Sequence, residues 1–442
     1  MFEKYESVVE EIDPIKYTGV VSKVQGLMIE SFGPQVVIGE MCHIVVPFKD
    51  EVVPAEVVGF NGKHVQLMPF GNMEGIEPGC TVIALGESMK IHVSEQLLGR
   101  VLDSMGKPMD GKGSLGSVEY FSVSNPPPDV LKRSKITERM ITGVRAIDAM
   151  TPVGKGQRIG IFSGSGVGKS TLLGMIARNT KADVNVIALI GERGREVREF
   201  IESDLGPEGL KRSVIIVSTS DTPPLARVKG AYVATAVAEY FRDQGKDVML
   251  LFDSVTRFAR SQREIGLAVG EPPATRGFTP SVFSILPKLL ERCGTSDKGT
   301  ITGFYTILVD GDDMDEPISD NVRGILDGHI ILSRKLAESY HYPAIDVLNS
   351  LSRLTTKITS FEEQQVIGHI RKLLAVYSEA EDLINVGAYA EGSNPDIDLA
   401  IEKIEGIREF LQQKIEENSP LKDTLARVFE IAGIEIDEAV SV

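Results

Sequence analysis

Nine residues in the middle of the chain decide the fold: Ser163-Gly164-Ser165-Gly166-Val167-Gly168-Lys169-Ser170-Thr171. They follow the apolar run Arg158-Ile159-Gly160-Ile161-Phe162 and precede the apolar run Leu172-Leu173-Gly174-Met175-Ile176-Ala177. This order predicts a buried strand, a glycine-rich turn and a helix. Such a turn wraps backbone N–H groups around a polyphosphate, with Lys169 reaching the β- and γ-phosphates and the Ser170 hydroxyl placed for Mg²⁺. The stretch therefore predicts a nucleoside triphosphate site at residues 163–171.

The match to the phosphate-loop pattern has one departure. The pattern asks for glycine at its first position, where this chain has Ser163. Three glycines remain in the turn, at 164, 166 and 168, so the change is small. The alternative is a chance Gly/Ser turn between two core elements, but the strand and helix on either side favour the phosphate loop.

Bulk composition limits the classes of function. The chain has 442 residues, 42% of them hydrophobic and 25% charged, which is ordinary for a globular protein of two or three domains. No stretch approaches the roughly 18 apolar residues that a membrane span needs. A net charge of −16 disfavours a broad nucleic-acid or anionic-membrane footprint, although a local basic channel remains compatible with it.

The chain start and the cysteines indicate the compartment. The first residues, Met1-Phe2-Glu3-Lys4-Tyr5-Glu6-Ser7, show neither a basic nor an apolar signal region, so we expect a cytoplasmic protein. Its three cysteines are far apart in sequence and lack metal-site spacing, which predicts reduced thiols in the core. They are Cys42, Cys80 and Cys293.

Residues 1–16 form a separate segment in the sequence pattern. Within residues 1–13, apolar side chains recur about one helical turn apart among acidic ones, which predicts a short amphipathic helix. A helix this short is marginal alone, so it either packs on the next domain or docks on a partner.

The rest of the chain divides into three domains of a multidomain α/β protein. Residues 17–93 carry short β-rich runs punctuated by turn residues, as in a small antiparallel β-barrel. Residues 94–358 alternate helical stretches with strand-like runs that are apolar on both faces, as a parallel sheet covered by helices requires. Residues 359–442 lose the β signal and predict an α-helical domain, with helices at 361–378, 380–386, 396–418 and 421–432.

The strand-like runs fall into two groups, one in the barrel stretch and one in the central stretch. Barrel strands are expected at 17–24, 27–31, 43–47, 51–60, 64–69, 81–85 and 90–93. Residues 97–111 read as a turn-rich passage, and a stiff Pro-rich connector follows at 125–129. Strands of the parallel sheet are expected at 185–190, 214–218, 247–252, 299–309 and 329–332, with the nucleotide at their carboxyl edge.

Three further residues are candidates for chemistry. Asp253 ends a buried run, which favours a Mg²⁺ carboxylate over a simple turn cap. Glu192 ends another run and either activates the attacking water or begins a charged helix. Arg353 is the single charged residue in Asn349-Ser350-Leu351-Ser352-Arg353-Leu354. The local sequence fits an ordinary surface charge as well as it fits a catalytic group.

Over nearly its whole length the chain resembles the catalytic ATPases of the rotary and type III export group, most closely the flagellar and injectisome export ATPases. The stretches that carry this resemblance are Leu98-Gly99-Arg100-Val101-Leu102-Asp103, the phosphate loop, Gly191-Glu192-Arg193-Gly194-Arg195-Glu196-Val197, Leu251-Phe252-Asp253-Ser254-Val255-Thr256-Arg257, Val269-Gly270-Glu271-Pro272-Pro273-Ala274-Thr275-Arg276-Gly277, 310–317, Tyr342-Pro343-Ala344-Ile345-Asp346-Val347 and Val386-Gly387-Ala388-Tyr389.

The resemblance implies a homohexamer whose central domain is RecA-like, with ATP between subunits. It implies that Glu192 is the catalytic glutamate, Asp253 the Mg²⁺ carboxylate and Arg353 an arginine supplied to the neighbouring subunit. It further implies that Tyr342 stacks on adenine, that Arg193 and Arg257 neighbour the γ-phosphate, and that residues 265–278 face the central channel.

The resemblance also implies partners and a location. These are an export-ATPase regulator docking on residues 1–13, a central stalk protein, an export gate, chaperone–cargo complexes, and a peripheral position at the cytoplasmic face of the membrane.

The sequence is compatible to different degrees with four functions. The first is a flagellar export ATPase, with an injectisome ATPase as its nearest alternative. The second is the catalytic subunit of a rotary ATP synthase, disfavoured because the acidic Asp-Glu-Leu-Ser-Glu-Glu-Asp signature is missing near residues 378–385. The third is a ring helicase, disfavoured by the sparse aromatics of the barrel stretch. The fourth is a non-catalytic nucleotide-binding subunit, disfavoured by Glu192.

Overall fold

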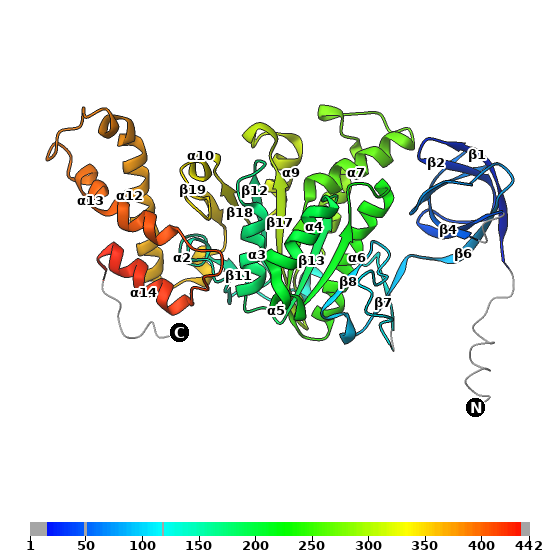
Figure 1. Ribbon diagram of the computed structural model, residues 1–442, viewed down its shortest axis with the longest axis horizontal. Helices are drawn as coiled ribbons and strands as arrows, with labels where there is room; N and C mark the ends of the chain where they lie inside the picture. Colours follow the sequence, from blue (N-terminus) through cyan, green and yellow to red (C-terminus); the bar gives the residue numbers. More distant parts are fainter. Residues whose placement is uncertain (1–15, 48–50, 117–118, 435–442) are drawn as a thin grey trace.

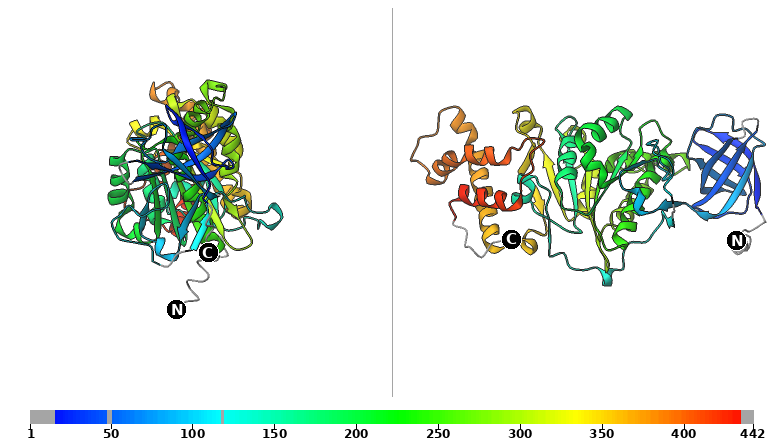
Figure 2. Two further views of the ribbon diagram at one scale, coloured as in Figure 1. Left: turned by 90° about the vertical axis from the view of Figure 1, so that its right-hand side faces the viewer. Right: turned by 60° about the horizontal axis from the view of Figure 1, so that its bottom comes forward.

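The computed structural model describes residues 16–47, 51–116 and 119–434, and three parts lie in a row (Figure 1). A β-barrel stands at one end, an α/β domain occupies the centre, and a helical domain forms the other end, as the right-hand view of Figure 2 also shows. This order confirms the predicted architecture. The helix predicted at residues 1–13 lies outside the described residues. Within the described ranges, no helix combines the length and apolar character that crossing a membrane needs.

The first part is a closed antiparallel barrel. Its strands follow the order β1-β2-β5-β4-β3-β6 around the barrel. Apolar side chains such as Val21, Ile29 and Leu67, each from a different strand, are fully buried inside the barrel. Successive side chains of a strand point to opposite faces, so such inward-facing residues are separated by outward-facing ones. The strands are β1 (Thr18–Gln25), β2 (Met28–Phe32), β3 (Glu40–Val46), β4 (Glu51–Asn61), β5 (His64–Pro69) and β6 (Thr81–Ser88).

One strand assigned to the barrel lies elsewhere. β7 (Lys90–Val93) pairs with β9 (Glu119–Ser122) in a separate two-stranded sheet, so the prediction of a barrel strand at residues 90–93 is wrong. The partner strand lies about 30 residues further along, and no local pattern signals a pairing at that distance. This small sheet packs beside α6 (Pro224–Asp243), between barrel and central domain.

The central sheet carries the order β19-β18-β12-β17-β15-β13-β14-β8. Its pairs are parallel except for the edge strand β19, which runs antiparallel to β18, and for the short β16 beside β17. The parallel sheet confirms the predicted fold, while β8 forms inside the passage predicted as turns. The strands are β8 (Arg100–Leu102), β12 (Arg158–Ser163), β13 (Val184–Ile190), β14 (Ser213–Ser218), β15 (Asp247–Asp253), β16 (Gly294–Thr295), β17 (Thr300–Leu308), β18 (Gly328–Leu332) and β19 (Ile345–Ser352).

Helices cover both faces of this sheet. Along β13, Val186, Ala188 and Ile190 belong to one buried cluster, and Ile187 and Leu189 belong to a second. The strand is buried on both sides, which explains its continuous apolar sequence. The other helices of the domain are α2 (Arg145–Met150), α3 (Lys169–Asn179), α4 (Gly194–Glu199), α5 (Gly206–Lys211), α7 (Val255–Ala268), α8 (Pro280–Leu290), α9 (Pro317–Ile325), α10 (Arg334–Glu338) and α11 (Thr355–Ile358), with a π-helix at Phe200–Leu205.

Short elements complete the central part. β10 (Arg139–Met140) pairs with β11 (Val153–Gly154), and single 3₁₀ turns occupy Glu95–Leu97, Val130–Lys132, Thr275–Gly277 and Asp310–Asp312. Cys42, Cys80 and Cys293 are buried and free.

The last part consists of α12 (Phe361–Asn385), α13 (Pro395–Leu411) and α14 (Leu421–Ala432). The two helices predicted at 361–378 and 380–386 are in fact the single helix α12, because no glycine or proline interrupts the chain between them. α13 begins as expected, with Asn394 as cap and Pro395 in its first turn. It ends at Leu411 rather than near 418, and the segment that follows turns back toward the central domain.

Candidate active site

The phosphate loop lies at the carboxyl edge of the sheet, between the end of β12 and the start of α3. Gly166 (φ 79°) and Gly168 (φ 90°) adopt left-handed backbone conformations that favour glycine. At Gly164 a Cβ atom would lie only 2.6 Å from Asp312 Oδ1 and from Arg334 Nη2. The backbone of the turn therefore favours glycine at 166 and 168, whereas at 164 the nearest atoms are the ends of two exposed side chains that can move aside.

Lys169 is the first residue of α3 and its ammonium group lies between two carboxylates. Its Nζ is 2.5 Å from Asp253 Oδ1 and 3.6 Å from Glu192 Oε1. Asp253, the last residue of β15, also accepts a 2.7 Å hydrogen bond from Thr306 Oγ1 of the neighbouring strand. The ends of three adjacent elements thus bring together the lysine and the two acids singled out from the sequence.

Glu192 follows β13 after the tight turn at Gly191 (φ 75°) and is buried. Arg257 holds this turn, because its Nη1 donates to Gly191 O (2.6 Å) and its Nη2 to Glu192 Oε2 (3.2 Å). Burial, and then the negative charge of nearby Asp253, raise the pKa of Glu192 to about 7. The positive charges of Lys169 and Arg257 act in the opposite direction. A carboxylate poised near neutral pH is suited to accept a proton from water.

The donors near the loop fit Mg²⁺. Ser170 in the first turn of α3 offers a hydroxyl oxygen and Asp253 a carboxylate oxygen, the ligand types that this hard cation prefers. No cluster of three or more His, Cys, Asp or Glu side chains suited to a metal occurs among the described residues. Such a site matches an ion that takes most of its ligands from water and phosphates rather than from the protein.

A cavity of about 580 Å³ opens beside the phosphate loop. Tyr342 lies against the loop, since a Cβ on Gly168 would come within 3.4 Å of its ring. Another part of the lining comes from the segment after α13, which the sequence assigned to a helix. The lining residues are Gly166, Gly168, Thr171, Leu172, Met175, Tyr340, Tyr342, Pro343, Gln413, Lys414, Ile415 and Glu416.

Residues 413–416 were missed by sequence reasoning. They stand more than 240 positions from the phosphate loop and form a polar stretch without a motif. Only the fold of the helical domain against the central domain brings them to the cavity.

Arg193 does not join the cluster around Lys169. Its side chain is 73% exposed and its Nη1 lies 2.5 Å from Glu196 Oε1, one turn along the same segment.

Arg353 lies at the opposite edge of the sheet from the phosphate loop. It follows β19, whose end at Ser352 pairs with Gly328 at the start of β18. Its side chain is exposed, and its backbone N–H donates to Asp327 O (3.0 Å). Arg353 therefore cannot reach the phosphate loop of its own chain.

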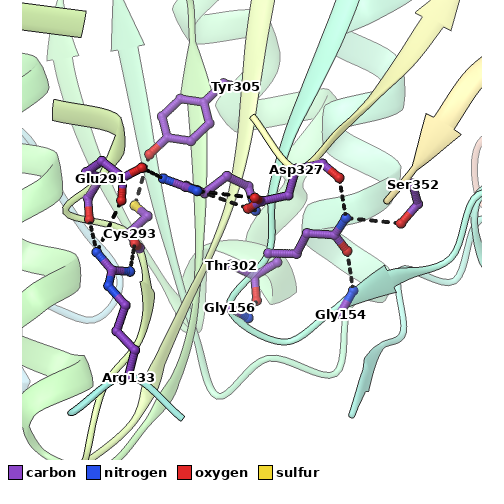
Figure 3. A network of polar contacts seen from close by, with 11 residues as sticks. Arg133, Gly154, Gly156, Glu291, Cys293, Thr302, Tyr305, Asp327 and Ser352 are labelled. Atoms are coloured by element: carbon purple, nitrogen blue, oxygen red, sulfur yellow. Dashed lines mark hydrogen bonds and ion pairs between the residues drawn. The ribbon is translucent and has the colours of Figure 1, made fainter. Parts of the chain in front are cut away.

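A polar network fixes this edge of the sheet (Figure 3). The side chain of Gln157 donates to Ser352 Oγ and to Asp327 O, each at 3.0 Å. The guanidinium of Arg158 binds Asp327 on one side and Glu291 on the other. The end of β19, from which Arg353 projects, is thereby held in place.

Comparisons with known proteins agree across the three parts. The β-barrel domain of the ATP synthase alpha/beta family matches residues 21–86, and the nucleotide-binding domain of that family matches residues 143–352. The T3SS EscN ATPase C-terminal domain matches residues 359–430. A flagellum-specific ATP synthase from Treponema pallidum is 56% identical over 99% of this chain and 98% of its own length.

The chain belongs to the family of flagellar and type III secretion ATPases. This family is a branch of the ATP synthase alpha/beta family, and the chain is accordingly an ATP-hydrolysing enzyme. A type 3 secretion system ATPase from Xanthomonas euvesicatoria, a second family member, is 51% identical and covers 92% of both chains. The assembled ATPase EscN of enteropathogenic E. coli, solved in complex with its central stalk EscO, superposes with a TM-score of 0.87 at 44% identity, over 94% of this chain and 100% of EscN.

Proposed function

We propose that this chain is the ATPase of a flagellar type III protein-export apparatus. In this proposal it hydrolyses ATP at sites between the subunits of a homohexamer, and hydrolysis drives chaperone release and export of flagellar proteins. One observation carries the proposal: Lys169, Glu192 and Asp253 meet beside the phosphate loop while Arg353 faces away at the far edge of the sheet. In this proposal a second copy supplies Arg353 and so completes the site.

Each residue at the loop has a role in this proposal. Backbone N–H groups of residues 163–171 and the Lys169 ammonium bind the β- and γ-phosphates. Ser170 and Asp253 would hold Mg²⁺, which neutralises charge on those phosphates. Glu192 accepts the proton of the attacking water, for which its raised pKa suits it.

The remaining residues act on the two ends of the nucleotide. Tyr342 stacks on the adenine in the cavity beside the loop. Arg257 adds positive charge near the γ-phosphate from its present position, whereas Arg193 reaches the phosphate only by leaving Glu196. Arg353 stabilises the transition state in the neighbouring subunit's site, a kind of contact worth about 10³–10⁵ in rate.

Partners and location form part of the proposal. The solved assembly of EscN with its stalk EscO supports a ring around a central stalk protein. Residues 1–13 are proposed to bind an export-ATPase regulator, and the ring to act on an export gate and on chaperone–cargo complexes. The protein would work in the cytoplasm, peripherally associated with the membrane at the export apparatus.

An injectisome ATPase is the second candidate, because secretion ATPases share about the same fold and half of the sequence. Higher identity to the flagellar relative favours the flagellar system. The carboxy-terminal match to type III secretion ATPases removes the support for a rotary synthase subunit or a ring helicase.

Expression in cells that lack their own flagellar export ATPase tests the assignment to a system. Recovered export of hook and filament proteins is expected. Recovery of injectisome secretion alone, in cells that lack the injectisome ATPase, would favour the second candidate.

The Glu192→Gln variant tests the chemistry. We expect hydrolysis to fall by about 10²–10⁴-fold, because the variant removes the base and leaves the phosphate cradle intact. ATP binding, measured by calorimetry, should be kept. Glu199→Gln, at the exposed last residue of α4, serves as the control and should retain turnover. Wild-type turnover in Glu192→Gln would remove Glu192 from the mechanism.

A further inference from the structure

Residues 412–417, in the segment that connects α13 to α14, close one side of the cavity proposed to hold the nucleotide base. Four of these residues, 413–416, line that cavity together with Tyr342. The segment belongs to neither helix, so its position depends on contacts with the central domain.

Arg145, the first residue of α2, supplies the buried charge in these contacts. Its guanidinium donates to three groups of the helical domain: Phe410 O (3.0 Å, from Nε), Gln412 O and the carboxylate of Glu417. The Arg145 side chain is only 8% exposed, and that of Glu417 is 36% exposed. A single side chain thus spans the segment from its start to its end.

Gln413 adds to this anchorage through both its side chain and its backbone. Gln413 Oε1 accepts a hydrogen bond from the N–H of Arg145 (2.8 Å), and Gln413 Nε2 donates to Gly143 O (2.8 Å). The N–H of Gln413 donates to Tyr342 O (3.0 Å), which joins the two walls of the cavity directly.

The same segment is tied to the phosphate-loop helix. At the end of α3, Arg178 donates to Ile415 O (2.6 Å) and Asn179 to Glu417 O (3.2 Å). The wall of the cavity, α2 and α3 therefore form one hydrogen-bonded unit.

We infer that Arg145 is a positioning residue for nucleotide recognition: it holds residues 412–417 where they enclose the base against Tyr342. This inference rests on the proposed nucleotide site. It assigns Arg145 to the affinity for the nucleoside part of the ligand and not to the phosphates, which contact the loop of residues 163–171.

The Arg145→Lys variant and two ligands test the inference by calorimetry in the presence of Mg²⁺. Lysine keeps the charge but cannot serve three acceptors in the planar geometry of a guanidinium. We expect the Kd for ADP to rise roughly 10-fold or more, while the Kd for pyrophosphate, which has no base, stays unchanged. Equal losses for both ligands would show a general structural role and overturn the inference, as would an unchanged Kd for ADP.

Arg139→Lys is the matched control. Arg139 is as buried as Arg145 and also binds a glutamate of the helical domain, but that residue is Glu363 in the first turn of α12 and not one of residues 412–417. Its variant should lose stability and keep the wild-type Kd for ADP. A Kd increase in Arg139→Lys equal to that in Arg145→Lys would overturn the inference.

Glu417→Gln gives a milder second variant, because its side chain is partly exposed and keeps a hydrogen-bond acceptor. We expect a smaller rise in the Kd for ADP, with the Kd for pyrophosphate again unchanged. An unaltered Kd for ADP in this variant and in Arg145→Lys would overturn the inference. If the wild-type chain bound neither ligand, the proposed nucleotide site itself would fail.

Discussion

Glu192 shows how the surroundings of one residue set its chemistry. Its carboxylate is buried and close to Asp253, so its pKa is raised to about 7. The role proposed for Glu192 requires its deprotonated form, since only that form can accept a proton from water. The proposed base is therefore active above neutral pH and is lost as the pH falls through its pKa.

The pH dependence of kcat/KM follows from this pKa. We expect kcat/KM for ATP hydrolysis to fall tenfold for each pH unit below about 7, because this parameter reports the free enzyme. Circular dichroism over the same pH range controls for unfolding. An acid limb near the ordinary glutamate pKa of about 4.3 would contradict the raised pKa.

The sequence identifies the residues at strand ends and not those that the tertiary fold delivers. Glu192 and Asp253 could be singled out because each ends an apolar run of a parallel sheet, whose carboxyl ends meet at one edge. Arg145 and Gln413 could not, because they are 268 residues apart and only the packing of two domains joins them.

Helix α13 shows what a local signal determines at the scale of an element. Its start was predicted because Asn394 and Pro395 form a cap and first turn, and Asn394 Oδ1 does accept a 3.0 Å hydrogen bond from the N–H of Asp396. Its end was misplaced, because residues 412–417 leave the helix for contacts with Arg145 that the sequence does not reveal. Strand β8 was missed because its three residues are too few to show a period of alternating apolar and polar side chains.

Replacing the cap tests its contribution. Asn394→Ala should lower the free energy of unfolding by about 1 kcal/mol, because the N–H of Asp396 loses its acceptor. Urea denaturation measures the change, and Asn394→Asp, which keeps an acceptor oxygen, is the control. ATP affinity should not change in either variant, since the cap does not line the cavity. Equal stability of Asn394→Ala and the wild type would show that the cap contributes nothing.

At the scale of the whole molecule, one buried ion pair joins the barrel to the central domain. Lys229 of α6 lies 2.6 Å from Glu56 of β4, with side chains 14% and 8% exposed. Burial raises the pKa of Glu56 although Lys229 acts against it. Neither residue belongs to a motif, so the sequence predicted the barrel and the sheet but not the contact that orients them.

Removing one partner of this pair should cost more than removing both. Lys229→Met leaves a buried carboxylate without its cation, for which we expect a loss of about 3–5 kcal/mol in the free energy of unfolding. The double variant Glu56→Leu, Lys229→Met should recover much of that loss. Guanidinium denaturation of the single and double variants measures both values. A double variant less stable than Lys229→Met would contradict a charge-driven penalty.

The central claim is that each active site is shared between two copies of the chain. Arg353→Ala alone should lower ATPase activity by about 10³–10⁵-fold without preventing ring formation, and Glu192→Gln alone should lower it by about 10²–10⁴-fold. Mixing the two variants measures the claim directly, because a subunit with an intact loop from Arg353→Ala can then border a subunit that still carries Arg353. With random assembly into head-to-tail rings, about a quarter of the interfaces combine both intact halves, so activity should appear on mixing. An inactive mixture of assembled rings would contradict a site completed by the neighbouring subunit.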